Sequence, residues 1–171
     1  MLKIGTISHG TMKVQDTAPA LLAALDSIKL SAEDRNTCFE VEQCLDTLRE
    51  AIDDGVDSDN QAEIEGCISD LEVEMYDVLV PLAETYAPDY CYVGSHPGDG
   101  SDLGVWPCED LFDDTTQGSF DGSCWRLRTN NHPSEENIPD DMSHALSVND
   151  HGNATLYRRS GSDWAECWAI V

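Results

Sequence analysis

The sequence predicts an α+β protein: an amino-terminal strand and helices that include an acidic antiparallel helix hairpin, then a small, mostly antiparallel sheet with a C-terminal β-meander. Two observations favour this class. Apolar residues recur at helical spacing between residues 16 and 87, and from Tyr90 onward their period changes to two. At 171 residues the chain has the length of one domain. We therefore expect a single domain with a helical part at 16–87, a sheet and loop part at 88–171 and a strand at 3–8.

The helical part divides into three expected helices. Asp16 or Thr17 can cap the first, with Pro19 in its opening turn. The second begins near Ser31 with a pattern like a capping box, and Gly55 ends it. The apolar stripes of the second and third helices are expected to meet in an antiparallel hairpin. They comprise Val41, Leu45, Leu48 and Ile52, and Ile64, Ile68, Leu71, Met75, Val78 and Leu82. Pro81 should kink or end the third helix near Val80.

The sheet part is expected to contain short strands joined by turns. The Gly94–Gly104 segment reads as a loop as far as Asp102, where the next strand follows, and residues 107–122 and 129–142 read as irregular. A meander at the C-terminal end that pairs with the first strand is the simplest arrangement. The expected strands cover residues 90–93, 103–106, 124–128, 145–148, 154–158 and 164–171.

Net charge is −25, from 34 acidic and 9 basic residues, and it is concentrated in the middle of the chain. Residues 31–90 carry −16, whereas residues 1–30 carry +1 and residues 142–171 carry −1. Such a surface repels nucleic acid and anionic lipid and attracts basic proteins. We therefore expect no direct binding to nucleic acid or membrane. Because no basic leader or long apolar run is present, we also expect a soluble protein in the cytosol of a host cell.

Seven cysteines with wide, irregular spacing do not match a zinc-binding pattern, so we expect buried, reduced thiols and no metal or cofactor. The five histidines are scattered. The 94–104 segment lacks a phosphate-binding, esterase or calcium-loop pattern. We expect no catalytic residue, although a small accessory protein or hydrolase that uses this loop is an open alternative.

The acidic helix faces are the candidate binding surface. A helix of about 24 residues is roughly 36 Å long. A hairpin of that length with a charge of −16 averages one charge per ~2.3 Å, against about one per 1.7 Å of axis in duplex DNA. The candidate partner-binding residues are Glu42, Asp46, Glu50, Asp53, Asp54, Asp57, Asp59, Glu63, Asp70, Glu74, Asp77 and Glu84. Secondary contacts are expected at Asp99, Asp102, Asp110, Asp113 and Asp114.

In size, charge and helix-borne carboxylates the chain resembles the DNA-mimic inhibitors of phages and mobile elements, such as antirestriction proteins and several CRISPR inhibitors. Residues 5–12, 94–106 and 149–157 are similar to segments of uncharacterised phage and plasmid reading frames. The resemblance implies a basic nucleic-acid-binding host protein as partner, such as a CRISPR effector or restriction enzyme. It leaves the oligomeric state open, a dimer included. The Asp-rich, Lys-poor composition also allows an alternative, a protein adapted to high salt.

Overall fold

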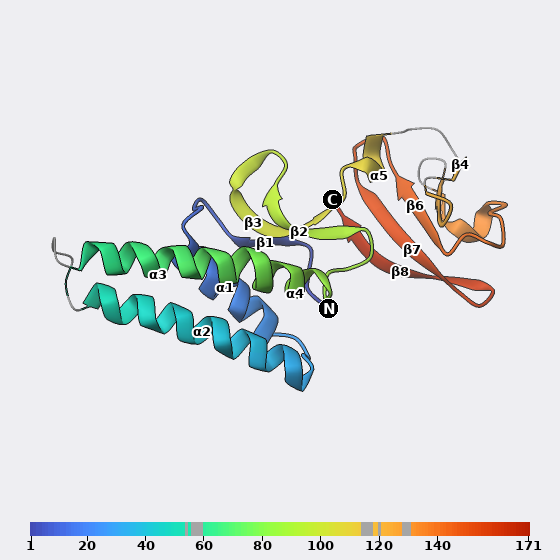
Figure 1. The fold of residues 1–171 in the computed structure, drawn as a ribbon. Coiled ribbons are helices and arrows are strands. Elements are labelled where there is room, and N and C mark those ends of the chain that lie inside the picture. The colour runs from blue at the N-terminus through green and yellow to red at the C-terminus, as the bar shows by residue number, and fades with distance from the viewer. Residues whose placement is uncertain (54, 56–59, 114–117, 120, 128–130) are drawn as a thin grey trace. The chain divides into compact units, whose positions relative to one another are not determined.

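The computed structural model describes residues 1–53, 55, 60–113, 118–119, 121–127 and 131–171 (Figure 1). These residues form two compact units, Met1–Trp106 and Pro107–Val171. Helices and mostly antiparallel strands are both present, which confirms the α+β class. Two strands of the expected sheet and loop part, at 91–96 and 99–107, belong to the first unit together with the helices. That the two units act as one domain stays a prediction.

The first unit contains a three-stranded sheet in the order β1-β3-β2. Its strands are β1 (Gly5–Ser8), β2 (Cys91–His96) and β3 (Asp99–Pro107). β1 runs antiparallel to β3, with Gly5 opposite Val105. Pairing of the first strand with the C-terminal meander was therefore a wrong expectation. β1 begins at Gly5 rather than at residue 3, and the expected 94–104 loop is mostly a β-hairpin that turns at Pro97 and Gly98.

A glycine is required where β1 and β3 approach each other. A Cβ atom on Gly104 would lie 2.5 Å from the Gly5 carbonyl oxygen and 2.5 Å from the Trp106 ring. Any side chain there would collide with the backbone of β1. Gly104 therefore allows the close contact that holds the first strand in this sheet.

The helices of the first unit are α1 (Val14–Asp26), α2 (Ala32–Asp53), α3 (Gln61–Val73) and α4 (Val80–Glu84), with a π-helical segment η1 (Glu74–Leu79) between the last two. α1 begins earlier than expected: Lys13 is its N-cap, and Asp16, Thr17 and Pro19 lie within it. α2 begins as expected, because the Ser31 hydroxyl accepts the Asp34 N–H at 3.0 Å.

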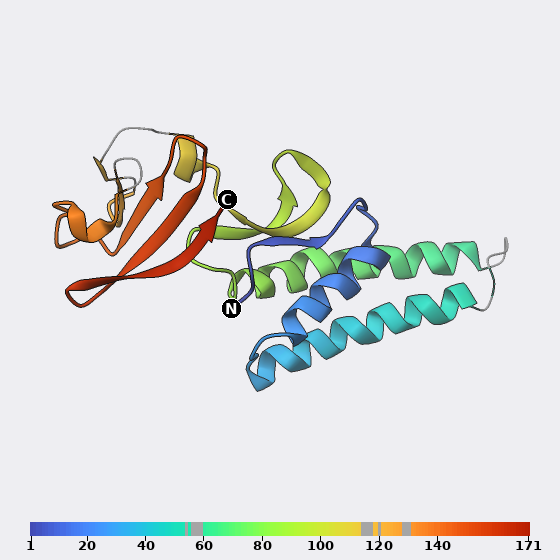
Figure 2. The ribbon, with the colours of Figure 1, turned by 180° about the vertical axis from the view of Figure 1, so that it is seen from behind.

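α2 and α3 lie antiparallel and pack together as a hairpin, which continues through η1 into α4 (Figure 1). α1 crosses one side of this hairpin and contacts α2, α3 and η1, as the view from behind shows (Figure 2). We call that side the α1 side of the hairpin and the opposite side its open face. Leu21, Leu25, Leu48 and Leu71 are fully buried between these helices and supply much of the driving force for their packing.

The third helix departs from regular α-geometry before Pro81. The predicted apolar stripe is correct through Met75, but the buried positions then become Leu79 and Ala83 instead of Val78 and Leu82. A π-helical turn contains an additional residue, and this moves the buried positions one residue along the chain. Pro81 does not end the helix. The α-helix changes to the π-helical segment η1 before Pro81 and continues as α4, in whose first turn Pro81 lies. Helical structure then ends at Glu84 rather than at residue 87.

The second unit is a five-stranded sheet in the order β4-β5-β6-β7-β8. The strands are β4 (Gly118–Ser119), β5 (Cys124–Arg126), β6 (His144–Val148), β7 (Ala154–Ser160) and β8 (Asp163–Ile170). β5 and β6 are parallel and the other pairs antiparallel, so the C-terminal meander is confirmed. Segments expected to be irregular contain α5 (Asp110–Asp113) and a 3₁₀ turn, η2 (Pro133–Glu135).

A separate apolar cluster holds the second unit together. It contains Leu127, Ile138, Met142 and Ala145, and Trp125, Tyr157 and Trp164 pack against it. Arg159 donates to the carbonyls of Met142 and Pro139 and lies 4.4 Å from the centre of the Trp164 ring. Its role is therefore to bind backbone carbonyls and an aromatic face.

Candidate functional site

Most of the predicted partner-binding carboxylates lie on the surface of the helices. Of those in the described residues, Glu74 is half-buried and the others are exposed: Glu42, Asp46, Glu50, Asp53, Glu63, Asp70, Asp77 and Glu84. Asp54, Asp57, Asp59 and Asp114 lie outside the described residues. The exposed positions agree with the helical pattern, but the structure does not gather them on one face.

The α2 carboxylates follow the α1 side of the hairpin. Glu42 and Asp46 line a groove of about 280 Å³ that also includes Asp26 of α1. Glu50 continues their row one turn farther along the helix, and Asp53 follows three residues later. We call Glu42, Asp46, Glu50 and Asp53 the α1-side row.

The carboxylates of α3 and η1 point to the other side of α2. Burial raises the pKa of the Cys44 thiol, and the negative charges of Glu74 and Asp70 raise it further. These two carboxylates therefore lie close to Cys44. Cys44 is two residues from both Glu42 and Asp46, and side chains at that spacing point to different sides of a helix. The structure thus separates Asp70 and Glu74 from the α1-side row.

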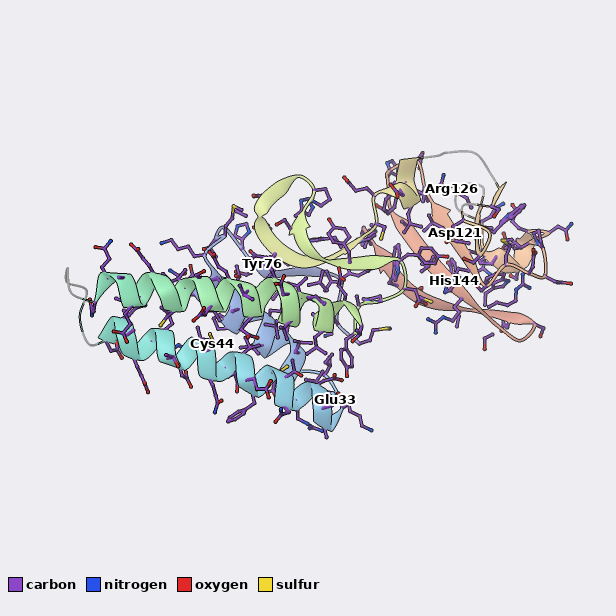
Figure 3. The ribbon with its side chains drawn as sticks, viewed as in Figure 1. Glu33, Cys44, Tyr76, Asp121, Arg126 and His144 are labelled. Atoms are coloured by element: carbon purple, nitrogen blue, oxygen red, sulfur yellow. The ribbon has the colours of Figure 1, made fainter. Side chains whose placement is uncertain are left out.

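Two α2 carboxylates that the sequence analysis did not select share the side of Cys44. Glu40 precedes Cys44 by one turn, and Glu33 precedes Glu40 by two turns; both are exposed. Figure 3 labels Glu33 and Cys44 on α2. Glu63 lies two turns before Asp70 on α3. We call Glu33, Glu40, Glu63, Asp70 and Glu74 the open-face row. The seven-residue spacing of Glu33 and Glu40 was visible in the sequence. Only the position of α1, however, identifies which side of α2 is open.

The two sides differ in their basic residues. Arg49 pairs with Asp46 at 2.9 Å on the α1 side. Arg35 lines a neighbouring hollow on that side together with Asp26 and Glu42. These are the only arginines of the hairpin helices, which contain no lysine. In the described part of the hairpin, the open-face row therefore contains five carboxylates and no basic side chain.

The π-helical segment changes the geometry beyond Glu74. At α-helical spacing, Asp77 and Glu84 would continue the α3 row, as the sequence analysis expected. η1 inserts an additional residue, so the α-helical spacing no longer holds from Glu74 onward. Asp77 and Glu84 are exposed, but we do not include them in the open-face row.

The carboxylates of the 94–104 segment hold the β2–β3 hairpin and the loop after β1. Asp102 accepts the Gly10 N–H at 3.0 Å, and its Oδ1 lies 2.5 Å from Nδ1 of His9. Asp99 accepts the hydroxyl of Ser101 at 2.7 Å, and this hydrogen bond is the main reason why the pKa of Asp99 lies below its ordinary value. These contacts give both carboxylates a structural role. That they also contact a partner stays a prediction.

The remaining candidates lie in the second unit. Asp110 is exposed on α5, and its carbonyl oxygen lies 3.5 Å from Nη2 of Arg126. Asp113 ends the same helix. Burial raises the pKa of the Cys124 thiol in β5 to about 12, so this thiol stays protonated at neutral pH.

Comparisons with family models, with curated proteins and with solved structures gave no match. In the part of the chain that the structure describes, no helix has both the length and the apolar composition needed to cross a membrane.

Proposed function

We propose that this protein is an inhibitor of the kind that phages and mobile elements direct against host defence, and that it occupies the nucleic-acid-binding site of a basic host protein, such as a CRISPR effector or restriction enzyme. The observation that carries the proposal is the open-face row, a set of exposed or half-buried carboxylates that no basic side chain of the described hairpin neutralises. A basic cleft can supply the missing positive charge.

The charge density of α3 and the first residue of η1 supports this function. Five acids and no base lie between Glu63 and Glu74, a distance of about 16.5 Å along the axis at 1.5 Å per residue. One charge per ~3.3 Å is close to that of a single DNA strand, about one per 3.4 Å. Like charges at neighbouring helical positions destabilise a helix. A surface that only had to be soluble would not need this density on one helix.

The α1-side row is less suited to this role. Arg49 compensates Asp46, and Arg35 lies near Glu42, so positive charge is already present there. We therefore place the partner at the open face and treat the α1-side carboxylates as contributors to the general negative field.

The alternative of a hydrolase based on the 94–104 segment has less support. Ser101 directly precedes Asp102 in the sequence, but its hydroxyl donates to Asp99 rather than to the His9 imidazole. Salt adaptation also has less support, because it gives no reason for both arginines of the hairpin helices to lie on the α1 side while acids lie on both sides.

Capture from a host lysate tests the proposal. Tagged protein is immobilised, and bound proteins are eluted with duplex or single-stranded DNA. We expect a basic nucleic-acid-binding protein to be retained and then released by one of these DNAs, because DNA and the open face compete for one site. Retention of no such protein, or of one that DNA does not displace, would contradict the proposal. Direct binding of DNA to this protein in a gel shift at low salt would also contradict it.

A further inference from the structure

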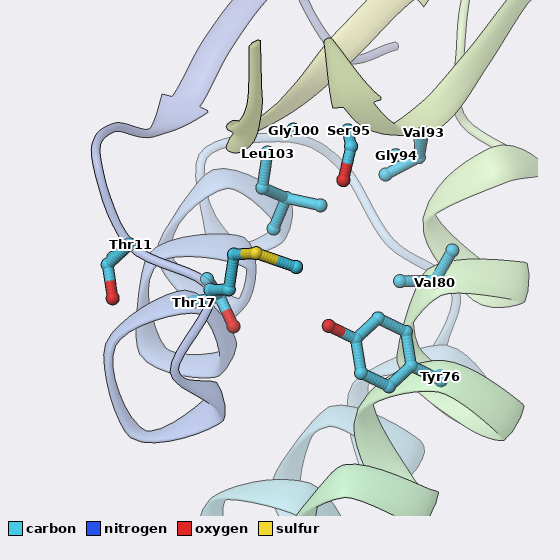
Figure 4. Close-up of a pocket in the computed structure, with 10 residues that line it drawn as sticks. Thr11, Thr17, Tyr76, Val80, Val93, Gly94, Ser95, Gly100 and Leu103 are labelled. Carbon is cyan, nitrogen blue, oxygen red and sulfur yellow. The ribbon is translucent and has the colours of Figure 1, made fainter. Parts of the chain in front are cut away.

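A small pocket lies on the first unit between the start of α1, the η1–α4 segment and the β2–β3 hairpin (Figure 4). Its volume is about 150 Å³. Val80, Val93 and Leu103 supply apolar walls, and Thr17, Tyr76 and Ser95 supply hydroxyl groups. Neither row of carboxylates contributes to it.

The hydroxyl of Thr17 is the main sign that this pocket holds a ligand. Thr17 is only 3% exposed, and its Oγ1 has no hydrogen-bond partner among the described residues. A helical threonine commonly donates to the carbonyl four residues earlier, but here the Lys13 carbonyl already accepts the N–H groups of Asp16 and Thr17. A buried hydroxyl without a partner destabilises the fold, so its retention needs a reason.

The side chains around this hydroxyl are arranged toward a common space. Figure 4 shows the hydroxyls of Thr17 and Tyr76 pointing toward one another across the pocket, and the hydroxyl of Ser95 pointing into it from β2. Tyr76 belongs to the π-helical segment η1, and Val80 is the first residue after this segment. π-helical turns are rare and occur frequently at functional sites. Here the π-helical turn carries one wall of the pocket.

The pocket has no acidic or basic lining residue, although the protein carries a net charge of −25. An anionic ligand would be repelled by the protein as a whole, and a cationic one would find no carboxylate to pair with inside. The available volume is large enough for a benzene-sized ring. Met12 also lines the pocket and is 71% exposed, so its flexible side chain can move aside to admit a ligand.

We propose that this pocket binds an uncharged small molecule about the size of a six-membered ring that carries one hydroxyl group. The ring contacts Val80, Val93 and Leu103, and the ligand hydroxyl satisfies Oγ1 of Thr17. This binding site goes beyond the proposed function and does not depend on it.

Phenol and toluene test the site, because they have nearly the same shape and only phenol carries the hydroxyl. Titration of the ¹⁵N-labelled protein, followed by amide chemical shifts, should show saturable changes at the lining residues. A Kd for phenol on the order of 1 mM is within reach of so small a ligand. Toluene should bind several-fold more weakly, and benzoate should not bind.

Thr17→Val keeps the shape of the side chain and removes the hydroxyl. In this variant the preference for phenol over toluene should disappear, while the melting temperature stays equal or rises. Thr47→Val is the matched control, because Thr47 is an exposed residue of α2 and its hydroxyl donates to the Gln43 carbonyl at 3.0 Å. It should keep the preference. If Thr17→Val does not fold, Tyr76→Phe provides a second variant. Tyr76 is 53% exposed, and loss of its hydroxyl should weaken phenol binding. Absence of saturable shifts, or an unchanged preference in the lining variant tested, would overturn the proposal.

Discussion

The two sides of the α2–α3 hairpin carry acidic residues in different surroundings. On the α1 side, Asp46 pairs with Arg49, and Arg35 lies in the same hollow as Glu42. On the open face, Glu40, Asp70 and Glu74 have no basic side chain beside them in the described hairpin. The total charge of a helix therefore does not identify a binding surface. The position of the few basic residues distinguishes the two sides.

The second unit shows a third use of acidic residues. The Asp121 carboxylate accepts the N–H groups of Ser123 and Cys124 at 2.8 and 2.9 Å and so fixes the turn before β5. Such a carboxylate satisfies backbone donors, as side chains at turns commonly do. Acids of this kind contribute to the net charge without forming a surface for a partner.

The largest expected effect concerns the π-helical register, which sets Asp77 and Glu84 apart from the open-face row. Leu79 is fully buried, whereas Val78 is half-buried. Leu79→Ala should therefore lower the free energy of unfolding by about 2–5 kcal/mol, and Val78→Ala by roughly 1 kcal/mol or less. Urea denaturation measures both. Equal losses of unfolding free energy, or a larger loss for Val78→Ala, would contradict the π-helical register and support the regular helix expected from the sequence.

Thiol reactivity tests which carboxylates lie near Cys44. Because burial and the charges of Glu74 and Asp70 raise the pKa of this thiol, Asp70→Asn with Glu74→Gln should lower that pKa and increase the thiolate fraction at pH 8. Alkylation of Cys44 by iodoacetamide, followed by peptide mass spectrometry, should then be faster, on the order of twofold. The variant Glu42→Gln with Asp46→Asn should leave the rate unchanged. Acceleration by the second variant alone would mean that the two rows are assigned to the wrong sides.

Single neutralisations should affect stability in opposite directions on the two sides. Asp70 and Glu74 are like charges one turn apart, so Asp70→Asn should raise the free energy of unfolding by about 0.2–0.5 kcal/mol. Asp46→Asn removes the partner of Arg49 and should give no comparable gain. Thermal melts at low ionic strength compare the two. The difference should shrink at about 1 M salt, where screening extends over only ~3 Å; a difference that persists there would have another cause.

A smaller effect concerns the contact that fixes the start of α2 relative to the end of α4. The Tyr86 hydroxyl donates to Asp34, and this hydrogen bond is the first reason why the pKa of Asp34 lies below its ordinary value of 3.8. The resulting stability is present above pH 3.8 and is lost as the pH falls through the lowered pKa. Asp34→Asn should therefore lower stability at neutral pH and flatten its decline below pH 4. If the stability of the variant declined below pH 4 as steeply as that of the wild type, the Tyr86–Asp34 contact would not be the cause of the decline.

Much of the first unit could be predicted from local patterns. Ser31 and the stripe from Val41 to Leu48 predict α2, and the stripe from Ile64 to Met75 predicts α3. The shift of burial to Leu79 could not be predicted, because Val78 and Leu79 are both apolar, as are Leu82 and Ala83, so the sequence fits the regular and the shifted register equally well. The pairing of β1 with β3 depends on contacts between residues about 100 positions apart in the chain.

The candidate surface was only partly predictable for a related reason. Helical spacing identifies which acids of α2 share a side, but both of its flanks carry exposed acids. The structure places α1 against Glu42 and Asp46, and this contact between distant segments makes the other flank the open one. Glu33 and Glu40 were therefore missed, although their spacing is regular.

Two matched variants test the central claim that the open face mimics nucleic acid. One neutralises Glu40, Glu63, Asp70 and Glu74, and the other neutralises Glu42, Asp46, Glu50 and Asp53, each to the corresponding amide. Both variants lose the same charge. Binding of each to the DNA-displaceable protein captured from host lysate is measured by calorimetry at 150 mM salt. Loss of desolvated charge pairs should weaken the open-face variant by about 1.5 kcal/mol or more, whereas the other variant should mainly associate more slowly. Equal weakening of the two variants, or greater weakening of the α1-side variant, would contradict the account.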